Sequence, residues 1–284
     1  MELTFLGTAA ATSCPLAFCR CAACTYARRN GGYDLRLRSS LLVNDDLLID
    51  LGPDLMAASF TLGLDVTRIR YLLQTHSHSD HFDAGHLITR MPEYACMDTP
   101  PLAVFASGAC IDHMSDALAR EETGARLDDA SWQEKLNLTV CPVRAFEPFS
   151  AGPYTVTALP SDHDRSDESM LYLISDGSAC VFYGVDTPLL RADVWAYLTA
   201  LPTPLDAAIL DQTYGPGVDG GGHLNADQTA RAFRRMREEG ILKRGARAFA
   251  THLSHEGTPP HAEISAFARV HGYEIAYDGL RLAL

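Results

Sequence analysis

The sequence lacks any apolar stretch of the length that crosses a membrane. It also lacks low-complexity tracts, linker-like runs of Gly, Ser and Pro, and internal repeats of short period. Its first residues, MELTFLGTAAATS, have no basic segment ahead of the apolar ones, so they do not resemble a signal peptide. We therefore expect a cytoplasmic protein with one domain over residues 1–284.

Basic residues are scarce compared with acidic ones. The chain has 23 Lys and Arg against 36 Asp and Glu, which gives a formal net charge of −13. Because an acidic surface repels a phosphate backbone, general nucleic-acid binding is disfavoured. A small phosphorylated substrate remains compatible with this charge, since a bound cation can reverse the field locally.

Two widespread catalytic signatures are also missing. The chain contains neither Gly-x-Ser-x-Gly, which marks a serine nucleophile, nor Gly-x-x-x-x-Gly-Lys-Ser/Thr, which cradles phosphates. The glycine-rich GPGVDGGGH at 215–223 lacks the context of a dinucleotide-binding turn and indicates a flexible loop. The chemistry must therefore come from other residues.

Short apolar runs alternate with helical patterns along the chain, which predicts an α/β protein with two sheets and helices outside them. We expect strands at 2–6, 39–43, 47–49, 70–74, 102–106, 138–146, 154–159, 171–174, 179–183, 207–210, 247–250 and 273–276, and helices at 54–63, 84–91, 110–120, 188–200, 226–239 and 260–270. The segment at about 92–147 has the weakest pattern and is predicted to be an insertion over the site.

Histidine and aspartate are concentrated in one short segment. His76, His78, Asp80 and His81 occupy six positions directly after the apolar run at 70–74. Imidazole nitrogen and carboxylate oxygen are ligands for zinc, manganese and iron. One such metal takes about three or four protein ligands. This segment can therefore begin two metal sites, and the remaining ligands must come from distant segments.

Three further candidates follow predicted strands. They are His163 in LPSDHD, Asp186 in YGVDT and His252 in ATHLSH. Functional groups of α/β folds gather at the carboxyl ends of strands, and a carboxylate such as that of Asp186 can bridge two ions. We interpret the remaining isolated histidines outside the glycine-rich loop as ordinary surface or core groups: His86, His113, His261 and His271.

The run THSHSDH and the segment LLIDLGP, which contains Asp50, resemble the metallo-β-lactamase fold hydrolases over almost the whole chain. The resemblance implies a four-layer αββα sandwich with a dinuclear metal site at one sheet edge. It also implies a role for each candidate: His76, His78 and His163 hold one metal, Asp80, His81 and His252 hold the other, Asp186 bridges them, and Asp50 orients a ligand.

Four of the eight cysteines lie within eleven residues, at positions 14, 19, 21 and 24. The thiolates of Cys19, Cys21 and Cys24 are spaced as in a tetrahedral structural zinc site, whose fourth ligand would be Cys14 or His255. Free thiols and an iron–sulfur site are the alternatives. We expect ordinary buried thiols at the other four positions: Cys96, Cys110, Cys141 and Cys180.

The cysteine cluster is similar to that of the phosphoribosyl 1,2-cyclic phosphate phosphodiesterase family of the carbon–phosphorus lyase pathway. In that family the structural zinc uses three cysteines and the second histidine of a segment like Thr251–His255, which points to His255. His223, in GGHLNADQTARAF, matches the position of its catalytic histidine. The resemblance implies a hydrolase that opens a small cyclic or sugar phosphodiester by attack of a metal-bridging hydroxide, with His223 and Asp80 as catalytic residues, and a homodimer.

Several alternatives share the same metal chemistry. An ester hydrolase, such as a lactonase, a thioesterase or a β-lactamase, would use the same ligands. The B protein of pyrroloquinoline quinone synthesis has the same fold and a cysteine-rich start, but that group tends to depart from the histidine motif found here. A tRNA 3′-end nuclease is disfavoured by the acidic chain. A metal carrier is disfavoured by the candidate proton donor, His223.

Overall fold

Two seven-stranded sheets form the centre of the protein in the computed structural model, which describes residues 1–94 and 98–284. The first sheet has the order β14-β1-β2-β3-β4-β5-β6. Its strands are β1 (Glu2–Gly7), β2 (Ser40–Val43), β3 (Leu47–Ile49), β4 (Tyr71–Leu73), β5 (Leu102–Ala106), β6 (Leu138–Pro142) and β14 (Arg281–Ala283). Strands β3 to β6 run parallel, and β1, β2 and β14 add antiparallel pairs.

The second sheet has the order β13-β12-β11-β10-β9-β8-β7. Its strands are β7 (Pro148–Ala151), β8 (Tyr154–Pro160), β9 (Met170–Ser175), β10 (Cys180–Gly184), β11 (Leu205–Asp211), β12 (Leu242–Thr251) and β13 (Glu274–Ile275). Strands β10 to β13 are parallel to one another, so their carboxyl ends meet at one edge of the sheet.

Side chains alternate between the two faces of each strand because the strand period is two. In β3, Leu47 and Ile49 pack between the sheets, whereas Leu48 packs on the outer face. In β9, Tyr172 lies between the sheets and Leu171 lies on the outer face. Both faces are therefore buried, which explains why the strands consist of apolar residues with few interruptions.

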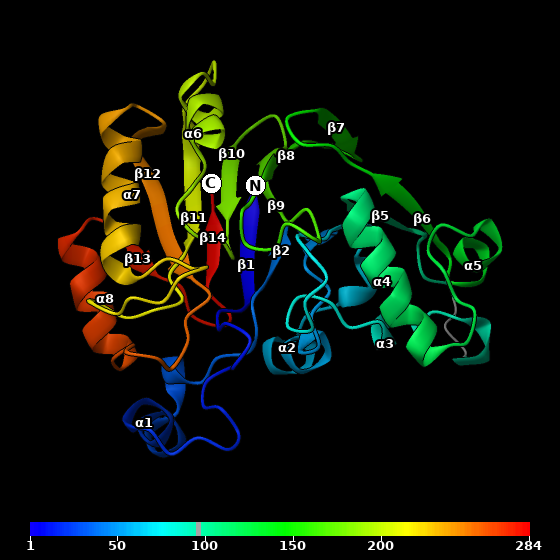
Figure 1. Cartoon of the computed structure of the whole chain (residues 1–284), viewed down its shortest axis with the longest axis horizontal. Helices are drawn as coiled ribbons and strands as arrows, with labels where there is room; N and C mark the ends of the chain where they lie inside the picture. Colours follow the sequence, from blue (N-terminus) through cyan, green and yellow to red (C-terminus); the bar gives the residue numbers. More distant parts are fainter. Residues whose placement is uncertain (95–97) are drawn as a thin grey trace.

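Helices cover the outer face of each sheet, as Figure 1 shows. The first sheet carries α2 (Leu55–Leu62), α3 (Gly85–Ile88) and α4 (Gly108–Glu121) on its outer core, and the second carries α6 (Ala192–Thr199), α7 (Ala226–Glu238) and α8 (His261–Val270). The remaining helices are α1 (Ala22–Asn30) and α5 (Ala130–Lys135), with short 3-10 turns η1 (Gly32–Asp34), η2 (Val66–Arg68) and η3 (Pro92–Tyr94). The predicted αββα sandwich is confirmed. No helix among the described residues is long and apolar enough to span a bilayer.

The prediction of one strand over 138–146, turning back at Pro148 and Gly152, was wrong. Strand β6 ends at Pro142 in the first sheet, and Pro148 begins β7, which forms a hairpin with β8 in the second sheet. Proline is tolerated here because β7 is an edge strand and the missing N–H breaks no ladder. The turn itself is at Gly152, whose φ of 59° favours glycine.

Among the α-helices and strands of the described residues, α1, α5, β7 and β14 were not predicted from the sequence. Helix α1 begins at an unusual N-cap, because the thiol of Cys21 accepts a hydrogen bond from the backbone N–H of Cys24. The insertion over 92–147, which contains β5, α4, α5 and β6, stays a prediction. The expectation of a buried thiol at Cys96 falls outside the described residues.

Candidate metal centre

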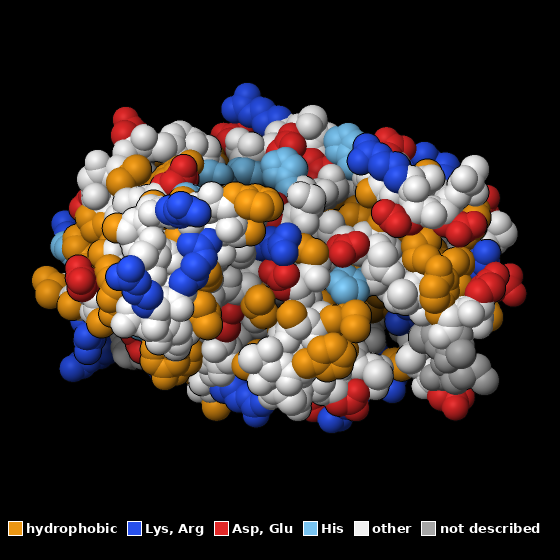
Figure 2. Space-filling model, turned by 90° about the horizontal axis from the view of Figure 1, so that it is seen from below, with side chains coloured by type: hydrophobic (Ala, Val, Ile, Leu, Met, Phe, Trp, Pro, Cys, Tyr) orange, Lys and Arg blue, Asp and Glu red, His pale blue; other side chains and the backbone are white. Residues whose placement is uncertain are grey.

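The candidate ligands gather where the carboxyl ends of parallel strands from both sheets meet. His76 follows β4 in the first sheet, while His163, Asp186 and His252 follow β8, β10 and β12 in the second. Seen from below in Figure 2, histidine side chains lie together with acidic ones on one part of the surface. The two sheets thus contribute ligands to a shared edge, as the sequence predicts.

A first group of possible ligands contains His76, His78, His163 and Asp186, whose donor atoms all lie within 4.8 Å of one another. Nε2 of His163 is 3.2 Å from Nδ1 of His78. Oδ2 of Asp186 is 3.3 Å from Nε2 of His76, and its Oδ1 is 3.2 Å from Nδ1 of His163. Three imidazoles and one carboxylate therefore converge on a single point.

A second group contains Asp80, His81, His252 and again Asp186, within the same 4.8 Å limit. Nε2 of His81 is 3.0 Å from Oδ2 of Asp186, 3.2 Å from Oδ2 of Asp80 and 3.3 Å from Nε2 of His252. Because Asp186 belongs to both groups, its two oxygens lie between two sets of imidazoles. This is the arrangement of a bridging carboxylate.

The donor set fits divalent cations. Two imidazole nitrogens that face each other, such as those of His81 and His252, repel unless a proton or a cation lies between them. Among the described residues, Nε2 of His76, Oδ1 of Asp186 and Nδ1 of His223 are buried without a partner of hydrogen-bond geometry. Buried polar atoms are normally satisfied, so these atoms are suited to coordinate a cation.

Ionised carboxylates make the centre attractive to cations. Burial alone would raise the pKa of Asp80, but His81 and His252 beside it outweigh burial and hold that pKa far below its usual range. Burial likewise lowers the pKa of His252, yet Asp186 and Asp211 outweigh it and raise that pKa to about 9. In each case the protonated imidazole balances the charge of the carboxylate beside it. Bound cations would balance the charge of these carboxylates instead.

Asp50 orients His81, a member of the second ligand group. Its Oδ2 lies 2.7 Å from Nδ1 of His81, and its Oδ1 accepts hydrogen bonds from the N–H and the hydroxyl of Thr75, both 2.8 Å. These contacts fix the ring of His81 with Nε2 toward Asp186. Asp50 has a φ of 66°, a conformation that aspartate tolerates better than most residues.

Asp211, which the sequence analysis missed, does the same for His252. Its Oδ2 is 3.3 Å from Nδ1 of His252, and Thr213 supports both residues through its hydroxyl. A signal was present in the sequence, because Asp211 ends the buried run AAILD just as Asp50 ends LLID. An acidic residue at the end of a buried strand therefore marks the site in both sheets.

His223 lies just before α7 and reaches the same centre. Its Nδ1 is 2.9 Å from Oδ1 of Asp186 and 3.5 Å from Oδ2 of Asp211. Burial disfavours its charged form, but these two carboxylates outweigh burial and raise its pKa to about 10. Asn225 anchors the segment, because its side chain caps α7 in a capping box. His223 is thus held in place although a glycine-rich loop precedes it.

The three clustered cysteines meet His255 in a separate group. Nδ1 of His255 is 3.5 Å from Sγ of Cys19 and 3.3 Å from Sγ of Cys21, and Cys24 completes the set. Cys14 is not part of the group, so the structure favours His255 as the fourth ligand. A backbone N–H from Cys24, followed by His255, lowers the pKa of Cys21 to about 6. Three sulfurs and one nitrogen match a tetrahedral zinc site.

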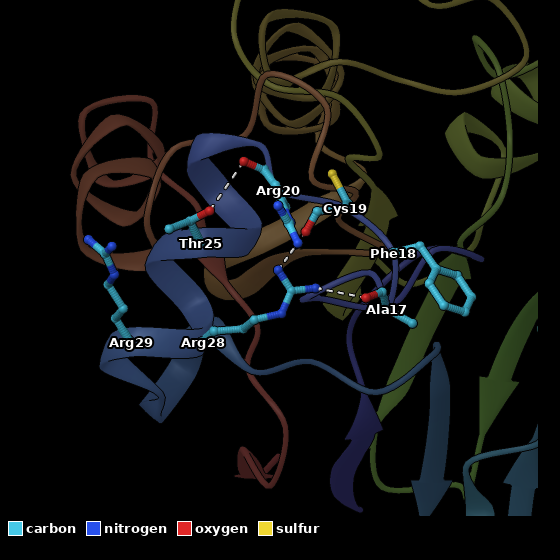
Figure 3. A pocket seen from close by; sticks show the side chains of 7 residues that line it. All are labelled: Ala17, Phe18, Cys19, Arg20, Thr25, Arg28 and Arg29. Carbon is cyan, nitrogen blue, oxygen red and sulfur yellow. Dashed lines mark hydrogen bonds between the residues drawn. The ribbon is translucent and has the colours of Figure 1, made fainter.

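The loop that carries these thiols is pinned from α1. Figure 3 shows Arg28 reaching back to the carbonyl oxygens of Ala17 and Cys19, at 3.2 and 2.5 Å. Thr25 also donates a hydrogen bond to the carbonyl of Arg20. The cysteines are therefore held close together by the protein itself.

The other cysteines only partly match the expectation. Cys110 is buried, whereas Cys141 and Cys180 are half-buried and not fully enclosed. Cys141 lies on β6, the edge strand of the first sheet, and Cys180 is the first residue of β10 in the second sheet. None of the described cysteines takes part in a disulfide.

We expect Gly52→Ala to weaken the metal centre. A Cβ at this position would lie 2.6 Å from the backbone oxygen of Asp80, so the turn that carries Asp80 and His81 must move. Displacing a reacting group by about 1 Å can cost on the order of a hundredfold in rate. Metal content and hydrolysis should both fall, as measured by metal analysis and an activity assay.

Gly108→Ala is the matched control for this change. A Cβ there meets nothing within 4 Å, and the residue begins α4. The control should leave metal content and activity unchanged. Equal behaviour of the two variants would show that close contact between Gly52 and Asp80 does not shape the site.

The chain matches the family model described as a β-lactamase superfamily domain over residues 46–253. It belongs to this superfamily of metal-dependent hydrolases with the metallo-β-lactamase fold, as the histidine motif predicted. The fold thereby implies the binding of divalent metal. A comparison with curated proteins gives no significant match.

Solved structures extend this likeness over the whole chain. A diphosphatase from the PhnP family is similar with a TM-score of 0.73 and 21% identity, covering 100% of this chain and 97% of that one. Zn²⁺-bound PqqB from Methylobacterium extorquens gives 0.72 and 20%, with 100% of both chains covered. Human tRNase Z, short form, gives 0.64 and 18%, covering 100% and 99%. At these identities the likeness shows the fold.

Proposed function

We propose that this protein is a metal-dependent phosphodiesterase that opens a small cyclic or sugar phosphodiester. One observation carries the proposal: Asp186 is shared by two ligand groups, and His223 lies 2.9 Å from its free oxygen. A proton-carrying side chain thus stands beside the point where a substrate would meet the metals. The structural neighbours that include a diphosphatase and a tRNase support chemistry at phosphorus.

When bound, two divalent cations would activate water and neutralise charge on a phosphoryl oxygen, and zinc, manganese and iron all suit these ligands. The protein supplies the orientation. Asp50 and Asp211 fix the rings of His81 and His252 from behind. Asp80 adds a carboxylate that is ionised at neutral pH.

His223 is the proposed proton donor. Its Nδ1 faces Asp186 and Asp211, so its Nε2 is left for a substrate. From there it can hydrogen-bond a phosphoryl oxygen or protonate the leaving alkoxide. The ring is 20% exposed, which lets it reach a bound molecule while the two carboxylates hold it.

We further propose that Cys19, Cys21, Cys24 and His255 hold a structural zinc. The substrate is proposed to be a small molecule. The homodimer and the cytoplasmic location stay predictions.

His223→Ala tests the catalytic proposal. General acid catalysis contributes about 10²- to 10⁴-fold, so kcat for a cyclic ribose phosphate should fall by about that range while metal content is retained. Bis(p-nitrophenyl) phosphate should lose less, because its leaving group needs little protonation. The assay compares both substrates and a simple lactone on metal-loaded protein.

His271→Ala is the control, since His271 follows α8, outside the ligand groups, and its ring packs against that of Phe267. It should behave as the wild type. Turnover of the lactone alone, indifferent to His223, would instead identify a carboxylic-ester hydrolase. An equal loss on both phosphodiesters would assign His223 to binding and not to proton transfer.

A further inference from the structure

Asp167 is a buried carboxylate that the proposed chemistry does not use. It is 1% exposed and lies in the loop between β8 and β9, which also carries His163. Its Oδ2 accepts a short hydrogen bond from the N–H of Ser77, and its Oδ1 accepts another from the hydroxyl of Ser77 at 3.0 Å. Ser77 is the residue between His76 and His78. The carboxylate of Asp167 is therefore hydrogen-bonded to the backbone of the histidine motif.

The same residue reaches a third segment. Ser107, the N-cap of α4, donates its hydroxyl to the backbone oxygen of Asp167 at 2.8 Å. His113, two turns into the same helix, places Nδ1 2.6 Å from Oδ1 of Asp167. Asp167 thus joins the motif loop of the first sheet, the His163 loop of the second sheet and the helix that covers the first sheet.

A buried carboxylate is costly unless it is paired and hydrogen-bonded. Among the ion pairs of the described residues, the cationic partner of Asp167 is His113, which is 44% exposed. The contact with Asp167 in turn raises the pKa of His113. His113 is therefore the basic group that the structure places against the buried carboxylate of Asp167, with Nδ1 2.6 Å from Oδ1.

The contacts of Asp167 favour the first ligand group over the second. His76 and His78 of the first group lie in the histidine motif, and His163 lies in the loop between β8 and β9, which Asp167 joins to that motif. The same loop also places Oδ2 of Asp164 3.0 Å from Nε2 of His78. Asp80, His81 and His252, of the second group, are supported instead by Asp50 and Asp211.

We infer that Asp167 and His113 are positioning residues for the first ligand group. Asp167 clamps the backbone between His76 and His78 to the loop of His163. His113 holds the carboxylate of Asp167 in the position that makes this clamp. The inference rests on the proposed metal ligands. It assigns a role to the helix α4 segment that neither the histidine motif nor the proposed catalysis requires.

The test measures metal binding directly and does not depend on turnover. Co²⁺ is titrated into three metal-free proteins, and its binding is monitored by visible absorption. The proteins are the wild type, Asp167→Asn and His113→Gln. Loss of an outer contact to a ligand typically weakens metal binding by about 10- to 100-fold. We expect that loss in one of the binding steps, with the steps of the second ligand group and of the cysteine group unchanged. His113→Gln should show the smaller effect, and His113→Lys, which keeps a cationic donor, should recover part of it.

Asp129→Asn is the matched control. Asp129 accepts hydrogen bonds from the N–H and the hydroxyl of Ser131, the same pattern as Asp167 with Ser77, but on the exposed N-cap of α5. It should bind Co²⁺ as the wild type does. Thermal unfolding of each metal-free variant separates a loss of fold from a loss of positioning.

Unchanged binding in both Asp167→Asn and His113→Gln would overturn the inference. The inference would also be overturned if Co²⁺ binding weakened equally at every step and in proportion to the loss of thermal stability. Because His113 is half exposed, its variant remains informative if Asp167→Asn fails to fold. A wild type that binds metal in this way but hydrolyses no phosphodiester would refute the proposed function and leave the clamp intact.

Discussion

Replacing Asp186 by asparagine should reduce the rate of hydrolysis by more than about a hundredfold. Losing a residue that only contacts a metal ligand typically costs about 10- to 100-fold, and the loss of a ligand itself should cost more. Asp186 belongs to both ligand groups, so its loss affects both at once. Asparagine is the informative substitute because Asp186 has a φ of 58°, which asparagine also adopts. The change therefore removes a charge with little strain on the backbone.

The measurement combines metal analysis of the dialysed protein with the phosphodiesterase assay. Asp206→Asn serves as the control, because Asp206 pairs with Lys243 at 2.7 Å away from the ligand groups. The control should keep both metal and activity. Full metal content together with full activity in Asp186→Asn would contradict the bridging role.

The second large effect is expected for Cys21→Ser. Serine can still cap α1, as the thiol of Cys21 does, but it removes a thiolate that we propose as a zinc ligand. Structural zinc contributes directly to folding, so the variant should contain less zinc and unfold at a temperature lower by roughly 5–10 °C. A change of 1 kcal/mol shifts the unfolding temperature by about 2–4 °C in chains of 150–250 residues, and this chain of 284 residues lies just above that range.

Zinc analysis and calorimetry with and without a chelator test this expectation. Chelation should destabilise the wild type toward the variant and should have little effect on Cys21→Ser itself. Cys180→Ser, in a half-buried position outside the cluster, should keep the zinc. Unchanged zinc in Cys21→Ser would remove it from the ligand set, and visible absorption of a purified sample would favour the iron–sulfur alternative.

The candidate ligands could be selected from the sequence because metal chemistry restricts which side chains can bind a cation, and because each candidate follows a strand. His163, Asp186 and His252 each follow a buried apolar run, and that pattern is local. Asp167 could not be found in this way. Its partners Ser77 and His113 are 90 and 54 residues distant along the chain, and nothing local distinguishes it from an ordinary loop aspartate.

The fold shows the same division. Strands with two buried faces were predictable from their apolar runs, as in β3 and β9. Helix α1 was not, because a thiol caps it in place of the usual Ser, Thr, Asp or Asn. Strand β14 was missed because three residues with one buried side chain give too little periodicity, and only its pairing with β1 defines it.

The pairing of β14 with β1 joins the two ends of the chain, with Glu2 opposite Ala283. During synthesis β1 therefore cannot form its ladder with β14 until residues 281–283 have been made. His252 and His255 also emerge late, so neither the second ligand group nor the cysteine group can close on a nascent chain. Such long-range contacts slow folding and expose partly folded states. These two groups are therefore completed at the end of folding, whereas the first ligand group, whose last member is Asp186, can assemble earlier.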